Sequence, residues 1–270
     1  GGLNLSGSRL RRQQGGQAGN FAALASKTYN LEPLQLGEQG VPQSSNCLLI
    51  PGPTQEFSDY ELFQIDQALM RGTNLAVFAD AFIESSQQNQ SMGFQAPVYK
   101  KLNTNLEKLL AHYGLKIKKS FVLDKNCYQQ RLGQQYGGGE QDIYYAPLIK
   151  NLNINHDLKF MKNIKGLFAL KISPLKVDEN KFATKDIKAH ALFSSSEKSW
   201  EMQDNINLNP MFIQPPAEDT KMEKKTLAYF LEGKFSSFFA DKAIPQKQTD
   251  DPKTAKQSNA TQNAETEQNS

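Results

Sequence analysis

Short apolar runs alternate with amphipathic stretches over the first third of the chain, from Leu3 to about Ile83. A doubly buried strand forms a continuous apolar run, whereas a helix repeats its apolar positions about every 3.6 residues. This alternation is typical of β-α-β winding around a mainly parallel sheet. The predicted elements are the end of a strand at Leu3–Leu5, a short helix at 21–26, and strands at 31–36 and 47–50.

The segment from Ser58 to Gly72 predicts the best-marked helix. Ser58 followed by Glu61 forms a capping box, and Gly72 supplies the left-handed conformation that commonly ends a helix. The helix should stabilise the fold, because its apolar side chains fall on one face: Leu62, Ile65 and Leu69. It leads directly into a predicted strand at 74–79, which ends at Asp80.

A second helix of the same design is predicted after a polar linker. Thr104 with Glu107 forms its capping box, and Gly114 ends it. Residues 115–123 then predict another strand, which ends at Asp124. The apolar stripe of this helix is formed by Leu106, Leu109 and Leu110.

Beyond Asp124 the periodic signal weakens, and the predicted strands are separated by longer irregular loops. From Gln246 to Ser270 the only apolar residues are three alanines, which cannot build a core. We therefore predict a single α/β domain at 1–245 and a disordered polar tail or linker at 246–270. The expected later strands lie near 143–145, 167–172, 189–193 and 226–235.

The composition is that of a globular protein with enough apolar material for one large core. Of the 270 residues, 38% are hydrophobic and 22% are charged. The formal charge of +3 comes from 31 basic and 28 acidic residues that are scattered along the chain. A nucleic-acid-binding surface needs clustered basic residues, so no nucleic-acid partner is predicted. The densest basic stretch, Lys116, Lys118 and Lys119, is interpreted as the solvated face or guarded edge of a strand.

No apolar run approaches the roughly 18 residues that cross a bilayer, and the residues after Gly1 lack the order of a signal peptide. We expect the chain to be soluble. Because it starts without a methionine and close to a predicted strand, we interpret it as an excised piece. Its membrane-spanning or targeting parts would then lie outside this chain.

The cysteine and histidine spacing predicts neither a metal centre nor a cofactor. Cys47 lies in an apolar run and is interpreted as a buried small residue, and Cys127 as an unpaired loop thiol. No C-x-x-C pair is present. The histidines, His112, His156 and His190, are too far apart to form a local zinc-binding pattern.

The glycine-rich segment 6–19 precedes a predicted helix, where backbone N–H groups can bind an anion. It contains neither the P-loop pattern nor the dinucleotide-binding pattern. A flexible surface loop is therefore the favoured interpretation.

The serines at 194–196 follow a predicted strand and are preceded by His190, but no G-x-S-x-G turn is present. A histidine so close along a strand is more often a neighbour across the face than a catalytic base. Acid-base chemistry by Asp80 with Glu61 or Glu84 stays open, although single acids at strand ends more often cap helices or loops. The sequence thus predicts no catalytic residue.

A ligand would bind where the loops at the carboxyl ends of parallel strands converge. These loops bring together glycines, a strand-end acid, serines and the only tryptophan, which could hold a sugar by stacking and hydrogen bonding. The predicted ligand-binding residues are Gly52, Asp80, Ser194, Ser195 and Trp200. We expect Asp80 and Trp200 to share one concave surface. The alternative is structural: Asp80 caps a loop and Trp200 fills a gap.

Four motifs follow one another along the chain. Cys47 to Phe82 combines an apolar strand, a Gly-Pro turn, a Ser-Asp-x-Glu helix start and a strand ending in Asp. The others are Asn-Leu-x-x-Leu-Leu from Asn105, LFSSSEKSW from Leu192, and LAYFLEGKFSSFF from Leu227. Together they resemble the auxiliary domain beside the permease of GldG-like ABC transporters of the gliding-motility type. The helix-strand segment is also similar to the amino-terminal domain of an intraflagellar transport protein.

The resemblance implies a Rossmann-like or flavodoxin-like, mostly parallel sheet flanked by helices, with the shape of class I glutamine amidotransferases but without their catalytic residues. Thr73 and Ala81 stand where the family pattern has glycine and proline, which affects the local turns. The resemblance further implies a periplasmic domain that is tethered to the inner membrane by other segments. Its expected partners are the permease and ATPase subunits of an ABC transport system.

We therefore predict a non-catalytic, structural or ligand-sensing domain of an ABC transport system. One alternative is a carbohydrate-active or amide hydrolase that uses the crevice at the strand ends. Another is a free solute-binding protein, which usually has two similar lobes, whereas the sequence has one clear α/β unit.

Overall fold

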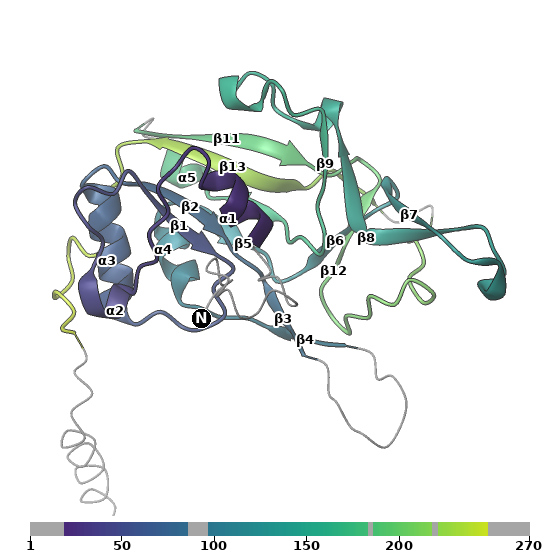
Figure 1. Ribbon diagram of the computed structural model, residues 1–270, viewed down its shortest axis with the longest axis horizontal. Coiled ribbons are helices and arrows are strands. Elements are labelled where there is room, and N and C mark those ends of the chain that lie inside the picture. Colours follow the sequence, from purple (N-terminus) through teal and green to yellow (C-terminus); the bar gives the residue numbers. More distant parts are fainter. Residues whose placement is uncertain (1–18, 86–96, 183–185, 218–220, 248–270) are drawn as a thin grey trace, which may run out of the picture.

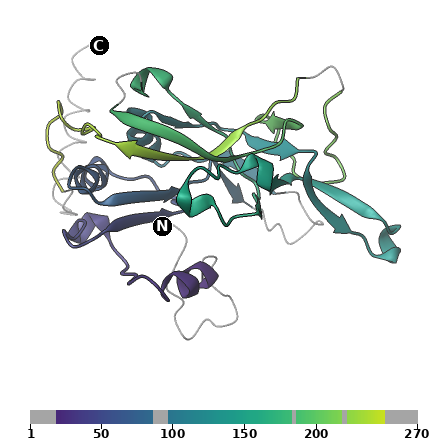
Figure 2. The same ribbon diagram turned by 90° about the horizontal axis from the view of Figure 1, so that it is seen from above.

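The computed structural model describes residues 19–85, 97–182, 186–217 and 221–247. The strand end expected at Leu3–Leu5, nearly all of the glycine-rich loop 6–19 and tail residues 248–270 lie outside these ranges. Helices α3 and α4 gather at one end of the molecule, and strands β7 and β8 form an arm that projects from the other end (Figures 1 and 2).

The helices of the described ranges are short, and α3 alone among them exceeds two turns. They are α1 (Gly19–Ala25), α2 (Leu36–Gln39), α3 (Asp59–Met70), α4 (Leu106–His112) and α5 (Glu179–Phe182), with 3-10 turns η2 (Gln134–Tyr136), η3 (Asn151–Asn153) and η4 (Lys159–Met161).

The described strands form several small sheets. They are β1 (Cys47–Pro51), β2 (Asn74–Phe78), β3 (Phe82–Ser85), β4 (Val98–Lys101), β5 (Leu115–Ile117), β6 (Phe121–Asp124), β7 (Cys127–Arg131), β8 (Glu140–Lys150), β9 (Gly166–Phe168), β10 (Leu175–Val177), β11 (Ile187–Ser194), β12 (Ser199–Met202) and β13 (Thr226–Gly233). Within the described ranges, the pairs are β1-β2, β5-β10, β11-β13, β6-β12 and β3-β4, and β7-β8-β9 is a three-stranded sheet.

The prediction of a Rossmann-like or flavodoxin-like sheet with the shape of class I glutamine amidotransferases is wrong. Of the strand pairs described, β1-β2 is parallel and the others are antiparallel. A parallel pair needs a crossover of about a dozen residues or more, usually a helix. Helix α3 provides this crossover between β1 and β2. After β2, the described strands pair in the antiparallel direction with strands before or after them in the chain. The β-α-β pattern therefore does not continue.

The capping signals of α3 are confirmed. Ser58 is the N-cap: Glu61 N donates to Ser58 Oγ at 3.2 Å, and Ser58 N donates to Glu61 Oε2 at 2.8 Å. Leu62 and Ile65 are buried, and Leu69 packs against the same cluster. Gly72 adopts a φ of 93°, the left-handed conformation expected at the helix end.

Helix α4 forms with its predicted apolar stripe, but it begins one residue later than its capping box suggests. Thr104 donates from its backbone N–H to Glu107 at 3.1 Å, yet the N-cap is Asn105 in a left-handed conformation. Leu106 and Leu109 are buried in the same core as Ile65 of α3. The apolar periodicity therefore located the helix, whereas the local polar signal placed its start incorrectly.

Three strand predictions differ from the structure. Residues 31–36 form no strand, and α2 begins at Leu36. The strand predicted at 115–123 is divided into β5 and β6, which pair with β10 and β12 respectively. Strand β1 lies where it was predicted, but its apolar run does not bury it on both faces as such a run would suggest, since Cys47 is exposed.

Three clusters of buried side chains form the core. One joins α3, α4 and β1 to Phe239, the second joins β3 and β6 to the loop around Leu208, and the third joins β6 and β8 to β13. Within the part of the chain that the structure describes, no helix is long and apolar enough to cross a membrane.

Candidate functional site

Gly52 and Asp80, two of the predicted ligand-binding residues, lie at the same end of the parallel pair β1-β2. Gly52 follows β1 with a φ of 54°, and its N–H donates to Phe78 O at 2.6 Å. Asp80 follows β2 and is exposed, and partial desolvation of its carboxyl raises its pKa above the ordinary value. These two residues are therefore neighbours across the ends of the two strands.

Ser194 and Ser195 are buried at the end of β11. Ser194 Oγ donates to Asn153 O at 3.5 Å. Ser195 Oγ lies 2.7 Å from Ser199 Oγ and accepts a hydrogen bond from Lys225 N at 2.8 Å. Both hydroxyls thus have protein partners and connect the end of β11 to neighbouring segments.

Trp200 lies on β12, half-buried, with its ring centroid 5.3 Å from that of Tyr144. It packs against the apolar cluster that contains Ala81, the residue after Asp80. Trp200 and the residue after Asp80 therefore belong to one cluster, but neither Asp80 nor Trp200 lines the two surface grooves described below. A ligand surface shared by these two residues stays a prediction.

A groove of about 300 Å³ lies between β10 and the start of β13. Its walls come from residues 174–177, Thr226 and Tyr229. We call it the lysine–glutamate groove, because its charged lining residues are Lys118, Lys176, Glu201, Glu223, Lys224 and Lys225.

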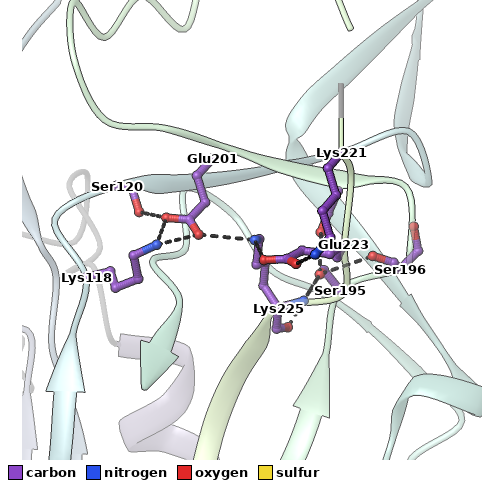
Figure 3. A network of polar contacts seen from close by, with 9 residues as sticks. Lys118, Ser120, Ser195, Ser196, Glu201, Lys221, Glu223 and Lys225 are labelled. Carbon is purple, nitrogen blue, oxygen red and sulfur yellow. Dashed lines mark hydrogen bonds and ion pairs between the residues drawn. The ribbon is translucent and has the colours of Figure 1, made fainter. Parts of the chain in front are cut away.

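Glu201 is the centre of the polar network beside this groove (Figure 3). Strand β12 pairs antiparallel with β6, and alternation along the strand places Trp200 and Glu201 on opposite faces. The Glu201 carboxylate accepts hydrogen bonds from Lys118 Nζ and Ser120 Oγ, both at 2.6 Å, and pairs with Lys225 Nζ at 3.3 Å. Lys225 Nζ also donates to Glu223 Oε1 at 2.6 Å. Positive and negative groups therefore alternate along the network.

Both glutamates of the network are ionised at neutral pH. Burial alone would raise the pKa of Glu201, but the hydrogen bonds from Lys118 and Ser120 outweigh it and hold this pKa below the ordinary value. The hydrogen bond from Lys225 lowers the pKa of the exposed Glu223 carboxyl. The glutamates thus fix the positions of Lys118 and Lys225.

Ser195, a predicted ligand-binding residue, and its neighbour Ser199 instead hold the backbone of residues 223–225, which line the groove. Besides the bond from Lys225 N to Ser195, Ser199 Oγ donates to Glu223 O at 2.7 Å. These contacts order the segment that carries the lysines into β13. Neither Ser195 nor Trp200 lines the groove itself.

Sequence reasoning missed the acids of the network, and it interpreted Lys118 only as part of a solvated strand. The available signal was the charged run from Lys221 to Lys225 before a strand. Glu201 carries no comparable signal, because its partner Lys118 lies 83 residues away along the chain.

A second groove, of about 490 Å³, lies between β4 and the loop after β12. We call it the amide-lined groove, because its polar lining combines Tyr99 and Lys101 with Gln203, Asp204, Asn205 and Asn207. Asn205 holds a left-handed conformation with a φ of 48°, which asparagine tolerates better than most residues. Amides beside an aromatic ring suit a neutral, hydroxyl-rich ligand.

No group of three or more histidine, cysteine, aspartate or glutamate side chains that could hold a metal occurs among the described residues. The predicted environments of the two thiols are reversed. Cys47 is exposed on β1, whereas Cys127 is buried at the start of β7. Both are free cysteines.

The sequence model of a family described as "ABC-type uncharacterized transport system" matches residues 7–266. The chain belongs to this family. It is an auxiliary domain of an ABC transport system, as the resemblance implied, and membership implies partners within such a system. The match does not extend to gliding motility, so that part of the expectation stays a prediction.

A solved structure, the "mmIFT52 N-terminal domain", is similar to this auxiliary domain at 13% sequence identity and a TM-score of 0.43. The similarity covers 70% of this chain and 68% of that chain. A comparison with curated proteins found no match.

Proposed function

We propose that this auxiliary domain is a non-catalytic, extracytoplasmic binding module, held beside the permease and ATPase subunits by membrane segments outside this chain. The observation that carries the proposal is that the candidate nucleophilic hydroxyls are buried, whereas other polar groups line the surface grooves. Ser194 and Ser195, which belong to the serine cluster weighed and rejected as a source of a nucleophile, are buried and bonded to other protein groups. The two surface grooves instead present lysines, carboxylates and amides.

The bonding of Ser195 supports binding over hydrolysis. A serine nucleophile needs a base within hydrogen-bond reach and access to the substrate. The partners of the Ser195 hydroxyl within the described residues are another serine, Ser199, and backbone groups. His190 instead lies 3.0 Å from Glu232 on the neighbouring strand.

The function is tested by purifying a tagged form of the protein from the membranes of cells that produce it. We expect the permease and ATPase subunits of one ABC transport system to co-purify in comparable molar amounts, as measured by quantitative mass spectrometry. Enrichment of neither subunit contradicts the proposal. Turnover of chromogenic glycosides or amides that is lost in Asp80→Asn would instead support the hydrolase alternative.

A second candidate function is the binding of a neutral carbohydrate in the amide-lined groove. Tyr99 offers a ring surface, while Gln203 and Asn207 offer amide donors and acceptors for hydroxyl groups. Titration of the ¹⁵N-labelled chain with neutral oligosaccharides should shift the amide resonances of residues 203–207. Gln203→Ala should weaken this response, and unchanged spectra with every sugar would contradict it.

A further inference from the structure

Two lysines face each other across the β5-β10 ladder, beside the lysine–glutamate groove. Lys116 on β5 and Lys176 on β10 are partners in this antiparallel register. Directly opposite residues of such a pair lie on the same face of the sheet, with Cβ atoms roughly 4.5–5.5 Å apart. Like charges in this arrangement destabilise the sheet. The two lysines therefore cost stability unless an anion neutralises them.

The described part of the chain does not supply this anion. Lys116 and Lys176 are exposed, and neither forms an ion pair with a described residue. Asp178 lies two positions beyond Lys176 but is not within ion-pair distance of either lysine. The neighbouring Lys118, by contrast, is held by Glu201. The uncompensated positive charge of this face is thus on Lys116 and Lys176.

The groove adds further positive charge beside this pair. Lys118 and Lys176 line it, and Lys224 and Lys225 reach it from the segment before β13. Its four lysines and two glutamates leave an excess of two positive charges. The glutamates already pair with Lys118 and Lys225 (Figure 3). The excess charge of the groove is therefore on Lys176 and Lys224, neither of which has an ion-pair partner among the described residues.

The size of the groove suits a small anion. Strands β10 and β13 lie side by side, so the space between them admits a small group and no further strand. Its volume of about 300 Å³ is at the lower end of the roughly 300–1,000 Å³ usual for ligand sites. Thr226 and Tyr229 also line it, and hydroxyl groups can donate hydrogen bonds to anion oxygens. A phosphate monoester carries a charge of about −1.5 to −2 at neutral pH, which matches the positive excess better than one carboxylate does.

We infer that the lysine–glutamate groove binds the phosphate group of a phosphorylated ligand. The phosphate lies beside Lys176 and Lys224, and its charge relieves the repulsion between Lys176 and Lys116. Lysine is a common phosphate-binding residue that acts as a point charge. Soluble phosphate esters and lipid headgroups both carry this group. The inference rests on the proposed function, because it names the class of ligand that the binding module takes.

Thermal unfolding of the 270-residue chain in inorganic phosphate is the deciding test. For a dissociation constant of about 1 mM, phosphate at about 10 mM should raise the melting temperature by about 3–5 °C over sodium chloride of equal ionic strength. Acetate at equal ionic strength should raise it by less than about 1 °C, because it carries one charge. In the ¹⁵N-labelled chain, phosphate should shift the amide resonances of residues 115–118 and 174–177.

Lys176→Gln distinguishes a phosphate-binding lysine from a structural one. At low ionic strength without phosphate, this variant should melt about 1–3 °C above the wild-type protein, because the repulsion from Lys116 is lost. It should also bind phosphate at least tenfold more weakly. The control is Lys188→Gln, at an exposed lysine on β11 that faces Glu232 across the β11-β13 ladder and does not line the groove. It should leave the phosphate affinity within twofold and should not raise the melting temperature.

Two further probes distinguish the sources of the phosphate group. A rise in melting temperature with glycerol 3-phosphate that is lost in Lys176→Gln would assign the groove to a soluble ester. Co-sedimentation with vesicles of phosphatidic acid in phosphatidylcholine that is lost in Lys176→Gln, without a response to glycerol 3-phosphate, would assign it to a lipid headgroup. Pure phosphatidylcholine vesicles are the control and should not retain the protein.

Three outcomes would overturn the inference. The first is no stabilisation by inorganic phosphate, and the second is equal stabilisation of the wild-type protein and Lys176→Gln. The third is a Lys176→Gln variant that melts below the wild-type protein without phosphate, which would show that Lys176 is a structural residue. None of these measurements depends on whether transporter subunits co-purify, so failure of this inference is distinguishable from failure of the proposed function.

Discussion

Tyr113 at the end of α4 donates a hydrogen bond through its phenolic hydroxyl to the fully buried carboxylate of Asp66 on α3. The same carboxylate accepts bonds from Ser237 Oγ at 2.6 Å and Phe238 N at 2.8 Å. Asp66 therefore joins both helices to the segment that follows β13. That segment places Phe239 in the helical core. One buried acid thus anchors the segment after β13 to both helices.

The Tyr113–Asp66 bond predicts a loss of stability at high pH. Burial and the Asp66 carboxylate raise the pKa of Tyr113 above its ordinary value, so folding favours the protonated phenol. The contribution of the protonated phenol to the free energy of unfolding is complete below the unfolded pKa of about 10. Above that pH it falls by about 1.4 kcal/mol per pH unit. Tyr113→Phe lacks this titration. Urea titrations should therefore show the stability difference between the two proteins narrowing above pH 10.

The control for this titration is Tyr128→Phe, at an exposed tyrosine on β7. Its stability difference from the wild-type protein should stay constant over the same pH range. A Tyr113→Phe difference that also stays constant would show that Tyr113 titrates equally in the folded and unfolded chains.

Asp124 is predicted to be a structural acid. Its buried carboxylate accepts hydrogen bonds from Ser196 N at 2.7 Å, Ser196 Oγ at 2.6 Å and Asn126 N at 2.8 Å. Asp124→Ala leaves these donors without a partner and should lower the free energy of unfolding by about 3 kcal/mol or more. Asp157→Ala, at an exposed acid, should change it by less than about 0.5 kcal/mol. Equal, small effects in urea denaturation would refute a structural role for Asp124.

Ile65 tests whether α3 stabilises the fold as its apolar stripe predicts. The side chain is 1% exposed and packs in the cluster that joins α3, α4 and β1. Ile65→Ala should cost about 2–5 kcal/mol through lost burial and an unfilled cavity. Ser58→Ala, which removes the helix cap, should cost about 1 kcal/mol. A neutral Ile65→Ala variant in thermal or urea unfolding would contradict the packing of this helix.

Cys47 provides a test of the extracytoplasmic location. Desolvation raises the pKa of both thiols, that of Cys127 to about 11, but Cys47 is exposed whereas Cys127 is buried and out of reach of a reagent. A membrane-impermeant maleimide should therefore label the protein in intact spheroplasts through Cys47. Cys47→Ser should abolish this labelling. Labelling that appears only after the spheroplasts are lysed would place the domain in the cytoplasm.

The sequence predicted those features of the fold whose causes are local. The capping box of Ser58 and Glu61 and the left-handed Gly72 involve residues close in the chain, so their spacing defines the geometry. The choice of strand partners is not local. Strand β6 pairs with β12, and no pattern within 121–124 specifies that partner or its antiparallel direction. The predicted parallel sheet failed for this reason.

The same distinction applies to the candidate site. Ser195 was noticed because three serines follow a strand, but its hydroxyl faces inward to Ser199. The groove depends on Lys118 meeting Glu201, residues that only the folded chain brings together. A sequence pattern can identify charged residues, but it cannot show which of them line the same groove.

The central claim is that this auxiliary domain is held beside the permease and ATPase subunits of an ABC transport system on the extracytoplasmic side of the membrane. The most direct measurement is crosslinking in intact cells with a membrane-impermeant, lysine-reactive reagent, followed by mass spectrometry of the tagged protein. We predict adducts between lysines of the domain and the permease subunit. No permease adduct, or adducts that form only after the cells are lysed, would contradict the claim.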